Sequence, residues 1–423
     1  MIASRPWHLL VLGMLSLAVV SVAEAQNAVA DWDANTLTAV VTTAKKGPPG
    51  ASVYFAYVSV AMYDAVNSID HRHQPFAVSV RAARGASEDA AVTAAAHDVL
   101  AYYFPAQKAT LDAQQSTSLA AIPDGQSKND GIAVGQAVAA QWLALRAGDG
   151  LEAPIVYTAG HGPGIWEPVP PNPVGAPNVL PPPVAPWLAQ FKPFALKSAD
   201  QFLADLPPPL SLASRAWAQD FNLTKNYGAV DSTYRTAQQT EIGKFWADHP
   251  SAQYSRAFRA LVASEHLSTA EAARLDAMSN VAFADSAAAC MNAKYHFAFW
   301  RPFTAIRDAD TDGNAATVAD PFWVPLDPTP GHPEYPAAHG CVTEALMDTL
   351  TAFFGTDLVP YTVTSAVTGT THNFSSFEDV VREVDSARIF GGMHYRNSVK
   401  QGNRLGRWVA DYILCHNFKE TDR

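Results

Sequence analysis

Half of the prolines in this 423-residue chain lie in one stretch, and that distribution limits where helices and strands can form. Fifteen of the 30 prolines fall between residues 154 and 209, in runs such as Pro168-Val169-Pro170-Pro171 and Pro181-Pro182-Pro183. Because proline lacks a backbone donor and clashes with the preceding helical turn, this stretch can be neither a helix nor a central strand. Its aromatic residues include Trp166, Trp187, Phe191 and Phe194. These residues predict an extended segment that wraps along a helical body.

The regions on either side of this segment are predicted to be helical. In the region 26–150 an apolar stripe recurs at helical spacing and comprises Tyr54, Tyr57, Val58, Ala61, Met62 and Ala65. In the region 211–423, Ser268 and Glu271 have the spacing of a capping box, which predicts a long helix running towards Lys294. We find no competing run of alternating apolar residues. The predicted fold is therefore all-α, with helical bundles joined by a proline-rich wrapping segment at 151–210.

Composition and charge exclude several classes of protein. Hydrophobic residues make up 48% of the chain and charged residues 16%, which is typical of a folded globular protein and not of a disordered one. The 29 Lys and Arg residues against 40 Asp and Glu give a formal net charge of −11. This charge repels phosphate backbones, so nucleic acid is not an expected partner. A small anion would need a local cluster of cations.

The first 25 residues have the three parts of an export signal. Arg5 lies in a short leading region, an apolar run extends from Leu9 to Val22, and Ala23-Glu24-Ala25 matches an A-x-A cleavage site. The run is shorter than the ~20 apolar residues that span a bilayer. We therefore expect cleavage near Ala25 and a secreted or periplasmic mature chain with no membrane span. Its three cysteines, Cys290, Cys341 and Cys415, allow at most one disulfide.

Lys294 and Arg301 form the first candidate site, seven residues apart in an aromatic-rich stretch that ends at Pro302. On one continuous helix this spacing is about two turns, or ~10 Å, which places both side chains on nearly the same face. Pro302 predicts the end of that helix, with Arg301 at its frayed terminus. Two unrelated solvated cations are the alternative. The surrounding aromatic residues favour burial, and buried cations need an anionic partner.

A second segment runs from His332 to Gly340 and contains two histidines. Pro336 and the small residues after it predict a turn into a helix that begins near His339. Backbone amides at such a helix start favour an anion.

The third segment runs from Ser386 to His394. Arg388 and His394 are six residues apart and cannot share one face of a regular helix. The pair Gly391-Gly392 predicts a break that turns His394 inward.

Taken in order, K-x6-R-P, P-x-x-H and R-x3-G-x-H resemble the three signature motifs of the superfamily of vanadium-dependent haloperoxidases and type-2 phosphatidic acid phosphatases, in its chloroperoxidase-like bacterial branch. The resemblance extends from Lys294 to His394, a quarter of the chain. It implies an all-α fold of two four-helix bundles, with an anion site in the region 211–423.

The same resemblance implies a role for each motif residue. Lys294, Arg301 and Arg388 would hold the oxygens of vanadate, or of phosphate in a phosphatase, and Lys294 would also polarise hydrogen peroxide. His394 would bind vanadium, or attack phosphorus as a nucleophile. His339 would be the general acid–base. These residue types suit the chemistry, because cations neutralise an oxyanion and imidazole carries protons near neutral pH.

Two positions depart from the family pattern. Ala337 and Ala338 stand where the second motif is usually P-S-G-H, so a hydroxyl donor worth about 1–3 kcal/mol to the oxyanion is missing. Ser398 stands where the third motif often has an aspartate, four residues after its histidine. In the phosphatases that acid helps to orient the nucleophilic histidine. Its absence therefore weakens the phosphatase interpretation more than the haloperoxidase one.

The resemblance thus implies a secreted vanadium-dependent haloperoxidase acting on hydrogen peroxide, a halide and an organic acceptor. His332, seven residues before His339, lies where bromoperoxidases also have histidine, so it is expected near the cofactor and favours bromide or iodide over chloride. Alternatively, His332 only braces the turn before Pro333. Two other functions remain open: an acid phosphatase with a phosphohistidine at His394, and a non-catalytic anion-binding relative, suggested by the two alanines.

Overall fold

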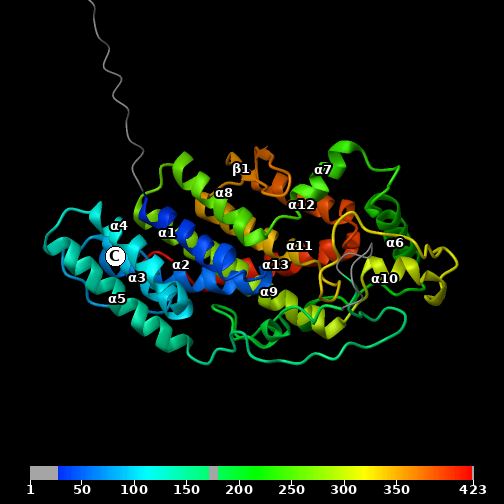
Figure 1. The fold of residues 1–423 in the computed structure, drawn as a ribbon, viewed down its shortest axis with the longest axis horizontal. Coiled ribbons are helices and arrows are strands. Elements are labelled where there is room, and N and C mark those ends of the chain that lie inside the picture. The colour runs from blue at the N-terminus through cyan, green and yellow to red at the C-terminus, as the bar shows by residue number, and fades with distance from the viewer. Residues whose placement is uncertain (1–26, 171–179, 422–423) are drawn as a thin grey trace, which may run out of the picture.

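Helices dominate the fold on both sides of the proline-rich segment (Figure 1). The computed structural model describes residues 27–170 and 180–421, and within them the chain forms thirteen α-helices and two short strands. The helices before the segment are α1 (Ala28–Leu37), α2 (Pro48–Asp70), α3 (Glu88–Tyr103), α4 (Lys108–Ala120) and α5 (Gln126–Arg146). Those after it are α6 (Arg215–Gly228), α7 (Ala237–Phe245), α8 (Pro250–Ser264), α9 (Thr269–Phe297), α10 (Pro302–Arg307), α11 (Ala338–Phe354), α12 (Phe377–Phe390) and α13 (Arg396–His416). The predicted all-α class is confirmed. The expected export signal lies outside the described residues.

Helix α9 lies at the centre and packs against α2, α11 and α13. Its start is the predicted capping box: the Ser268 hydroxyl accepts from the Glu271 amide, and the Glu271 carboxylate accepts from the Ser268 amide. Figure 1 shows α3, α4 and α5 gathered at one end of the long axis, with α6, α7 and α10 at the other. Because α9 touches helices from both halves of the chain, the two halves share one hydrophobic core.

Two glycines of α13 bring its backbone close to α11. A Cβ at Gly406 would lie 2.2 Å from the carbonyl oxygen of Cys341, and one at Gly402 would lie 2.5 Å from that of Ala337. Any side chain at either position would force the helices apart. This close approach fixes the start of α11, which carries His339.

The proline-rich segment packs along α9. Asp285 of α9 accepts hydrogen bonds from the backbone amides of Phe194, Ala195 and Leu196, at 2.6, 2.7 and 2.9 Å. Trp166 is buried, and its amide donates to the Ala298 carbonyl at 2.7 Å. The segment therefore helps to cover the end of α9 where Lys294 lies.

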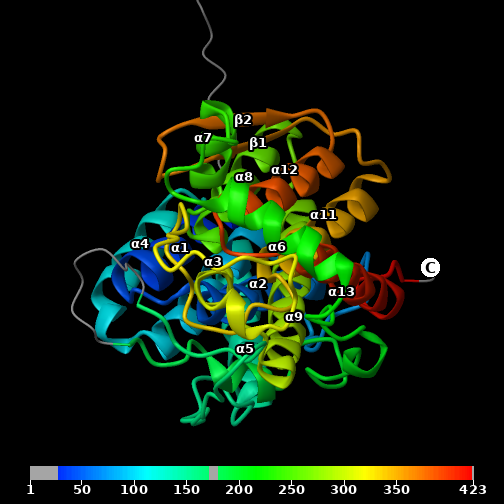
Figure 2. The same cartoon turned by 90° about the vertical axis from the view of Figure 1, so that its right-hand side faces the viewer.

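Two short strands, which the sequence analysis did not single out, accompany the helices: β1 (Tyr361–Thr364) and β2 (Thr371–Phe374) form an antiparallel hairpin that pairs Tyr361 with Phe374. Each strand has only four residues, too few for an alternating pattern to stand out. The hairpin packs on α8 and lies at the opposite edge from α5 (Figure 2). Over the described ranges, no helix combines the length and apolarity that a bilayer crossing requires.

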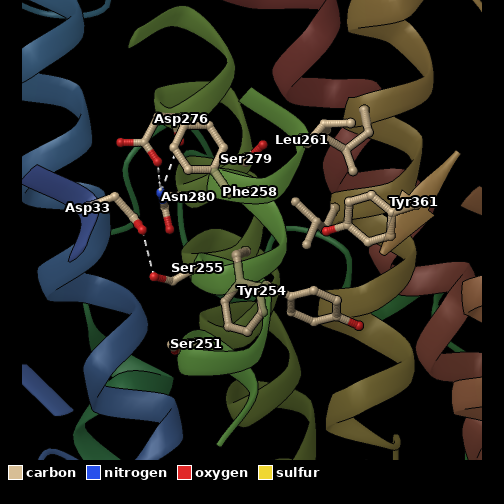
Figure 3. Close-up of a pocket in the computed structure, with 13 residues that line it drawn as sticks. Asp33, Ser251, Tyr254, Ser255, Phe258, Leu261, Asp276, Ser279, Asn280 and Tyr361 are labelled. Carbon is tan, nitrogen blue, oxygen red and sulfur yellow. Dashed lines mark hydrogen bonds between the residues drawn. The ribbon is translucent and has the colours of Figure 1, made fainter. Parts of the chain in front are cut away.

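A cavity of about 30 Å³ lies among α1, α8, α9 and α11 and contains two buried carboxyl groups (Figure 3). Asp33 accepts from the Ser255 hydroxyl at 2.6 Å and from Arg259. Asp276 accepts from the Asn280 side chain at 2.8 Å. Burial raises the pKa of Asp33 to about 6, and burial together with the charge of Asp33 raises the pKa of Asp276 well above its usual range. Asp33 is therefore the ionised partner of Arg259, and Asp276 holds the proton.

Candidate anion site

The first two site residues do not share a helix, contrary to the prediction. Helix α9 ends at Phe297, and Ala298 adopts a left-handed φ of 48° as its C-cap. Arg301 is the N-cap of the next helix, α10, and Pro302 occupies its first turn. Proline is compatible with that position because the amide there has no helical partner. Pro302 thus begins a helix, and Arg301 is fully buried instead of frayed.

Three cations are buried together at this site. Lys294 and Arg301 are 0% exposed and Arg388 is 2% exposed. Within the described part of the chain, none of the three forms an ion pair within 4.0 Å. Burial lowers the pKa of Lys294 to about 8 and that of Arg301 and Arg388 to about 10. The site is therefore a concentration of positive charge taken out of water.

Backbone carbonyls accept five of the eight hydrogen bonds that these cations donate among the described residues, and carboxylates accept none. Lys294 Nζ donates to the carbonyl oxygens of Pro333 at 2.9 Å and Glu334 at 2.8 Å. Arg301 donates to the carbonyl oxygens of His332 and Met393, both at 2.9 Å. Arg388 donates to the Trp246 carbonyl at 3.1 Å, while its Nε is buried without a partner among the described residues.

His394 lies in the loop between α12 and α13, after the break that Gly391 and Gly392 were expected to make; Gly392 has a φ of 73°. Its Nε2 lies 3.1 Å from Arg301 Nη1, and its Nδ1 lies 2.8 Å from Glu334 Oε1. Arginine can only donate, so Nε2 accepts and Nδ1 carries the proton that is donated to Glu334. The Nε2 lone pair thus accepts from Arg301 in this structure, and a metal centre bound at Nε2 would replace that hydrogen bond.

Glu334 is the residue that the sequence interpretation missed. It is fully buried and accepts from the Tyr395 amide at 3.1 Å and from the Ser398 hydroxyl at 2.7 Å, besides His394. The carboxylate expected at position 398 is thus supplied from another segment, and Ser398 holds it in place. A glutamate between two prolines, five residues before His339, was the only signal in the sequence. Burial raises the pKa of Glu334 to about 7, while Lys294 opposes the shift.

His339 is the second residue of α11, as predicted, and its Nε2 is buried with no hydrogen-bond partner in the described structure. It lines a cavity of about 220 Å³ together with His332, Arg388 and His394. Burial and the nearby charge of Arg388 lower the pKa of His339 well below its usual range, so the imidazole is neutral. A neutral imidazole at the cavity can accept a proton.

His332 lines the same cavity and is hydrogen-bonded to one of the cations, Arg301. Its Nδ1 lies 2.9 Å from Arg301 Nη2 and accepts from it, which leaves the His332 proton on Nε2. Burial and the charge of Arg301 lower the pKa of His332 well below its usual range. His332 therefore orients Arg301 as well as facing the cavity.

These donors fit a tetrahedral oxyanion. Three buried cations face two buried carboxyl groups. Glu334 is already engaged by His394, Tyr395 and Ser398, and Asp327 acts on Arg388 through its charge without an ion pair within 4.0 Å. A buried charge needs a compensating partner, and Arg388 Nε and His339 Nε2 are buried polar atoms without one among the described residues. A vanadate or phosphate ion would supply the missing charge and acceptors, and the His394 lone pair suits a metal centre.

Comparisons with known proteins point to one superfamily. Residues 274–421 match the family model for the second helical-bundle domain of VCPO. The vanadium chloroperoxidase of Curvularia inaequalis is 28% identical over a stretch that covers 38% of this chain and 31% of that protein. These matches support the vanadium haloperoxidase superfamily for residues 274–421. The curated match spans less than a third of that relative's length.

Solved structures of the superfamily share the fold over almost the whole chain. A bacterial vanadium-dependent iodoperoxidase superposes with a TM-score of 0.76 at 20% identity, covering 94% of this chain and 97% of that one. The holo form of a bacterial vanadium-dependent chloroperoxidase gives a TM-score of 0.70 at 16% identity, covering 93% and 97%. The superfamily fold therefore includes the N-terminal helices, which lie outside the family-model match.

Proposed function

We propose that this chain is a vanadium-dependent haloperoxidase that uses hydrogen peroxide to oxidise iodide or bromide in preference to chloride. The observation that carries the proposal is the cluster of three buried cations around the neutral, Nδ1-protonated imidazole of His394. The export signal expected in residues 1–25 would place the activity outside the cytoplasm.

Each side chain would have a separate task. Lys294, Arg301 and Arg388 would hold the oxygens of vanadate, and His394 Nε2 would bind the vanadium. Bound vanadate would supply a Lewis-acidic centre that activates hydrogen peroxide for two-electron oxidation of a halide. His339 would take a proton from the incoming peroxide and return it to the departing oxygen.

Glu334 would keep His394 in the productive tautomer. Its carboxylate accepts the Nδ1 proton, so the Nε2 lone pair stays directed at the ligand. The second-motif alanines leave this arrangement intact, since Ala337 contributes only its backbone to the N-cap of α11. Lys294 would add a fixed positive charge beside the bound peroxide.

The halide preference rests on His332. Its Nδ1 accepts a hydrogen bond from Arg301 Nη2, so this N–H group would not be directed at the oxyanion. The change in hydrogen bonding would alter how strongly the site withdraws electrons from the bound oxyanion. The structural similarity to an iodoperoxidase supports iodide, whereas the curated relative is a chloroperoxidase. The test compares iodide, bromide and chloride turnover by wild type and His332→Phe at several pH values. Equal use of chloride and bromide by wild type would refute the preference.

An acid phosphatase is the second candidate, and one observation favours it. The carboxylate that orients a nucleophilic histidine, which the motif itself lacks, is present as Glu334. A phosphohistidine at His394 Nε2, with His339 protonating the leaving group, is compatible with the same geometry.

One parallel assay separates the candidates. The apo protein is given vanadate, hydrogen peroxide and iodide in one arm, and a phosphate ester without vanadate in the other. Vanadate-dependent iodide oxidation that phosphate inhibits is the expected result. Ester hydrolysis without halide oxidation would favour the phosphatase, and neither activity with intact vanadate binding would identify a non-catalytic relative.

A further inference from the structure

We propose that Met393 is a positioning residue of the oxyanion site, which holds Arg301 through its carbonyl oxygen and Arg388 through its thioether sulfur. This inference rests on the proposed function, because it names a residue that prepares the same site for its anion. The motif R-x3-G-x-H does not specify this position, which is the residue directly before His394. The role is therefore carried by the contacts of Met393 in the structure.

Met393 contacts two of the three buried cations at once. Its carbonyl oxygen accepts from Arg301 Nη1 at 2.9 Å, and its sulfur accepts from Arg388 Nη2 at 3.1 Å. Within the described part of the chain, no other residue accepts hydrogen bonds from two of these cations. The residue is 3% exposed, so bulk water does not compete for either contact. Met393 thus fixes the two guanidinium groups relative to each other.

The turn that carries Met393 is closely packed. The Met393 amide donates to the carbonyl oxygen of Arg388, near the end of α12, at 3.3 Å. The preceding residue, Gly392, approaches α6 so closely that a Cβ there would lie 2.5 Å from the carbonyl oxygen of Gly228. A Cβ at Gly391 would lie 3.0 Å from the Met393 methyl carbon. Because both the backbone and the end of the side chain are confined, the sulfur is held against Arg388.

A thioether suits this position because it accepts a hydrogen bond without carrying a charge. Methionine sulfur is a weak, neutral acceptor, so Arg388 keeps its positive charge for a bound anion. A carboxylate at the same place would form a charge-assisted pair with the guanidinium and compete with that anion. Arg388 Nε is buried without a partner among the described residues, and it remains as a donor to the anion.

Core packing is the alternative role for a buried methionine, since its flexible side chain fills irregular gaps. Packing depends on shape and volume, so it would tolerate leucine better than a polar residue. Positioning depends on an acceptor atom, so it would tolerate glutamine better than leucine. The two roles therefore predict opposite orders for the same pair of substitutions.

The first test titrates three variants with orthovanadate and with phosphate by calorimetry, without peroxide. Met393→Leu leaves a buried Arg388 donor without its acceptor, and should weaken binding of both anions at least about fivefold. Met393→Gln supplies an amide oxygen in place of the sulfur, and should stay within about threefold of wild type. Met393→Glu holds the guanidinium but neutralises it, and should weaken binding at least about 20-fold. Wild-type affinity in Met393→Leu, or equal losses in the leucine and glutamine variants, would overturn the proposal.

Met278→Leu is the matched control. Met278 lies nearer the start of α9, is 1% exposed and is not among the residues that line the cavity at His339. It should bind both anions as wild type does. Equal losses in Met278→Leu and Met393→Leu would mean that general loosening of the core is responsible, and would overturn the proposal. Absence of saturable anion binding by the wild type would contradict the proposed function itself, which separates that failure from failure of the positioning role.

The second measurement follows the sulfur directly and does not depend on a variant's affinity. The wild-type protein is labelled with methionine that carries ¹³C in its methyl group, and the spectra of Met393→Gln and Met278→Leu assign the two resonances. Because the methyl group is bonded to the sulfur, its resonance responds to a change in the hydrogen bond from Arg388. We expect saturating phosphate to shift the Met393 resonance and to leave that of Met278 in place. Saturation with no change at Met393 would overturn the proposal.

Discussion

Two buried charge clusters lie against the same helix, and they balance their charge in opposite ways. Near the start of α9, Asp276 faces Asp33, and one Arg partner leaves one carboxyl group that keeps its proton. At the end of α9, Lys294 joins Arg301 and Arg388, and these three cations face two carboxyl groups, Glu334 and Asp327. Carboxyl groups can discharge by binding protons near neutral pH, but guanidinium groups cannot release theirs. The charge of the first cluster is thus balanced within the protein, whereas the charge of the second requires a bound anion.

The largest expected effect distinguishes the two histidines of the anion site. His394→Ala should weaken vanadate binding by at least about 100-fold, because it removes a direct ligand. His339→Ala should leave the affinity within about tenfold and reduce turnover by about 10²–10⁴-fold, because a general acid–base acts on the proton and not on the anchor. Calorimetry and steady-state rates measure the two quantities. Equal loss of affinity in both variants would contradict the division of roles.

Glu334 should produce an intermediate effect. Glu334→Gln removes the charge that holds the His394 Nδ1 proton, and should lower vanadate affinity about 10–100-fold. Ser398→Ala, which removes only one bond to Glu334, should have a smaller effect in the same direction. Vanadate titrations of both variants check this order. If Glu334→Gln binds vanadate as wild type does, the carboxylate is merely structural.

The two buried carboxyl groups, Asp33 and Asp276, should make the folding stability depend on pH in the opposite sense from a salt bridge. Both pKa values are raised above the unfolded value of 3.8, so the folded state binds more protons and stability falls as the pH rises above about 4. The contribution of Asp33 is lost by about pH 6, and that of Asp276 continues to fall up to its own raised pKa. Asp276→Asn imitates the protonated form and should add on the order of 1–3 kcal/mol to the free energy of unfolding at pH 8, and little at pH 4. Urea unfolding at both pH values measures this.

Asp33→Asn is the control for that measurement. It removes the anion that Arg259 and Ser255 bind, and should destabilise the protein at pH 8. Stabilisation by both substitutions would mean that the ionised and protonated partners are assigned the wrong way round.

The smallest expected effect concerns the thiols beneath the anion site. Cys290 and Cys341 are buried beside each other and Cys415 is exposed, all three as free thiols. The native protein should therefore react with one equivalent of a water-soluble thiol reagent, and the denatured protein with three. A single reactive thiol after denaturation without reductant would show that Cys290 and Cys341 form a disulfide.

Local signals in the sequence predicted the parts of the structure that depend on neighbouring residues. The capping box at Ser268, the helix start at His339 and the break at Gly391 each rest on a few adjacent side chains. The end of α9 could not be predicted in this way, because Ala298 adopts a left-handed backbone without the glycine that usually marks one.

Contacts between distant segments were beyond the sequence alone. Glu334 meets Ser398 from 64 positions away, and Ser255 meets Asp33 from 222 positions away. Neither pair leaves a periodic pattern, since each side chain is a single polar residue inside an apolar helix or loop. The motif residues were found because their spacing resembles a known family, but their orienting partner was not.

The central claim is that the buried cations form an oxyanion site, and calorimetric titration of the apo protein with orthovanadate tests it most directly. We expect one saturable site per chain, displaced by phosphate, lost in Arg301→Ala and retained in Asp276→Asn. The absence of saturable binding, or binding that phosphate does not displace and Arg301→Ala does not weaken, would contradict it.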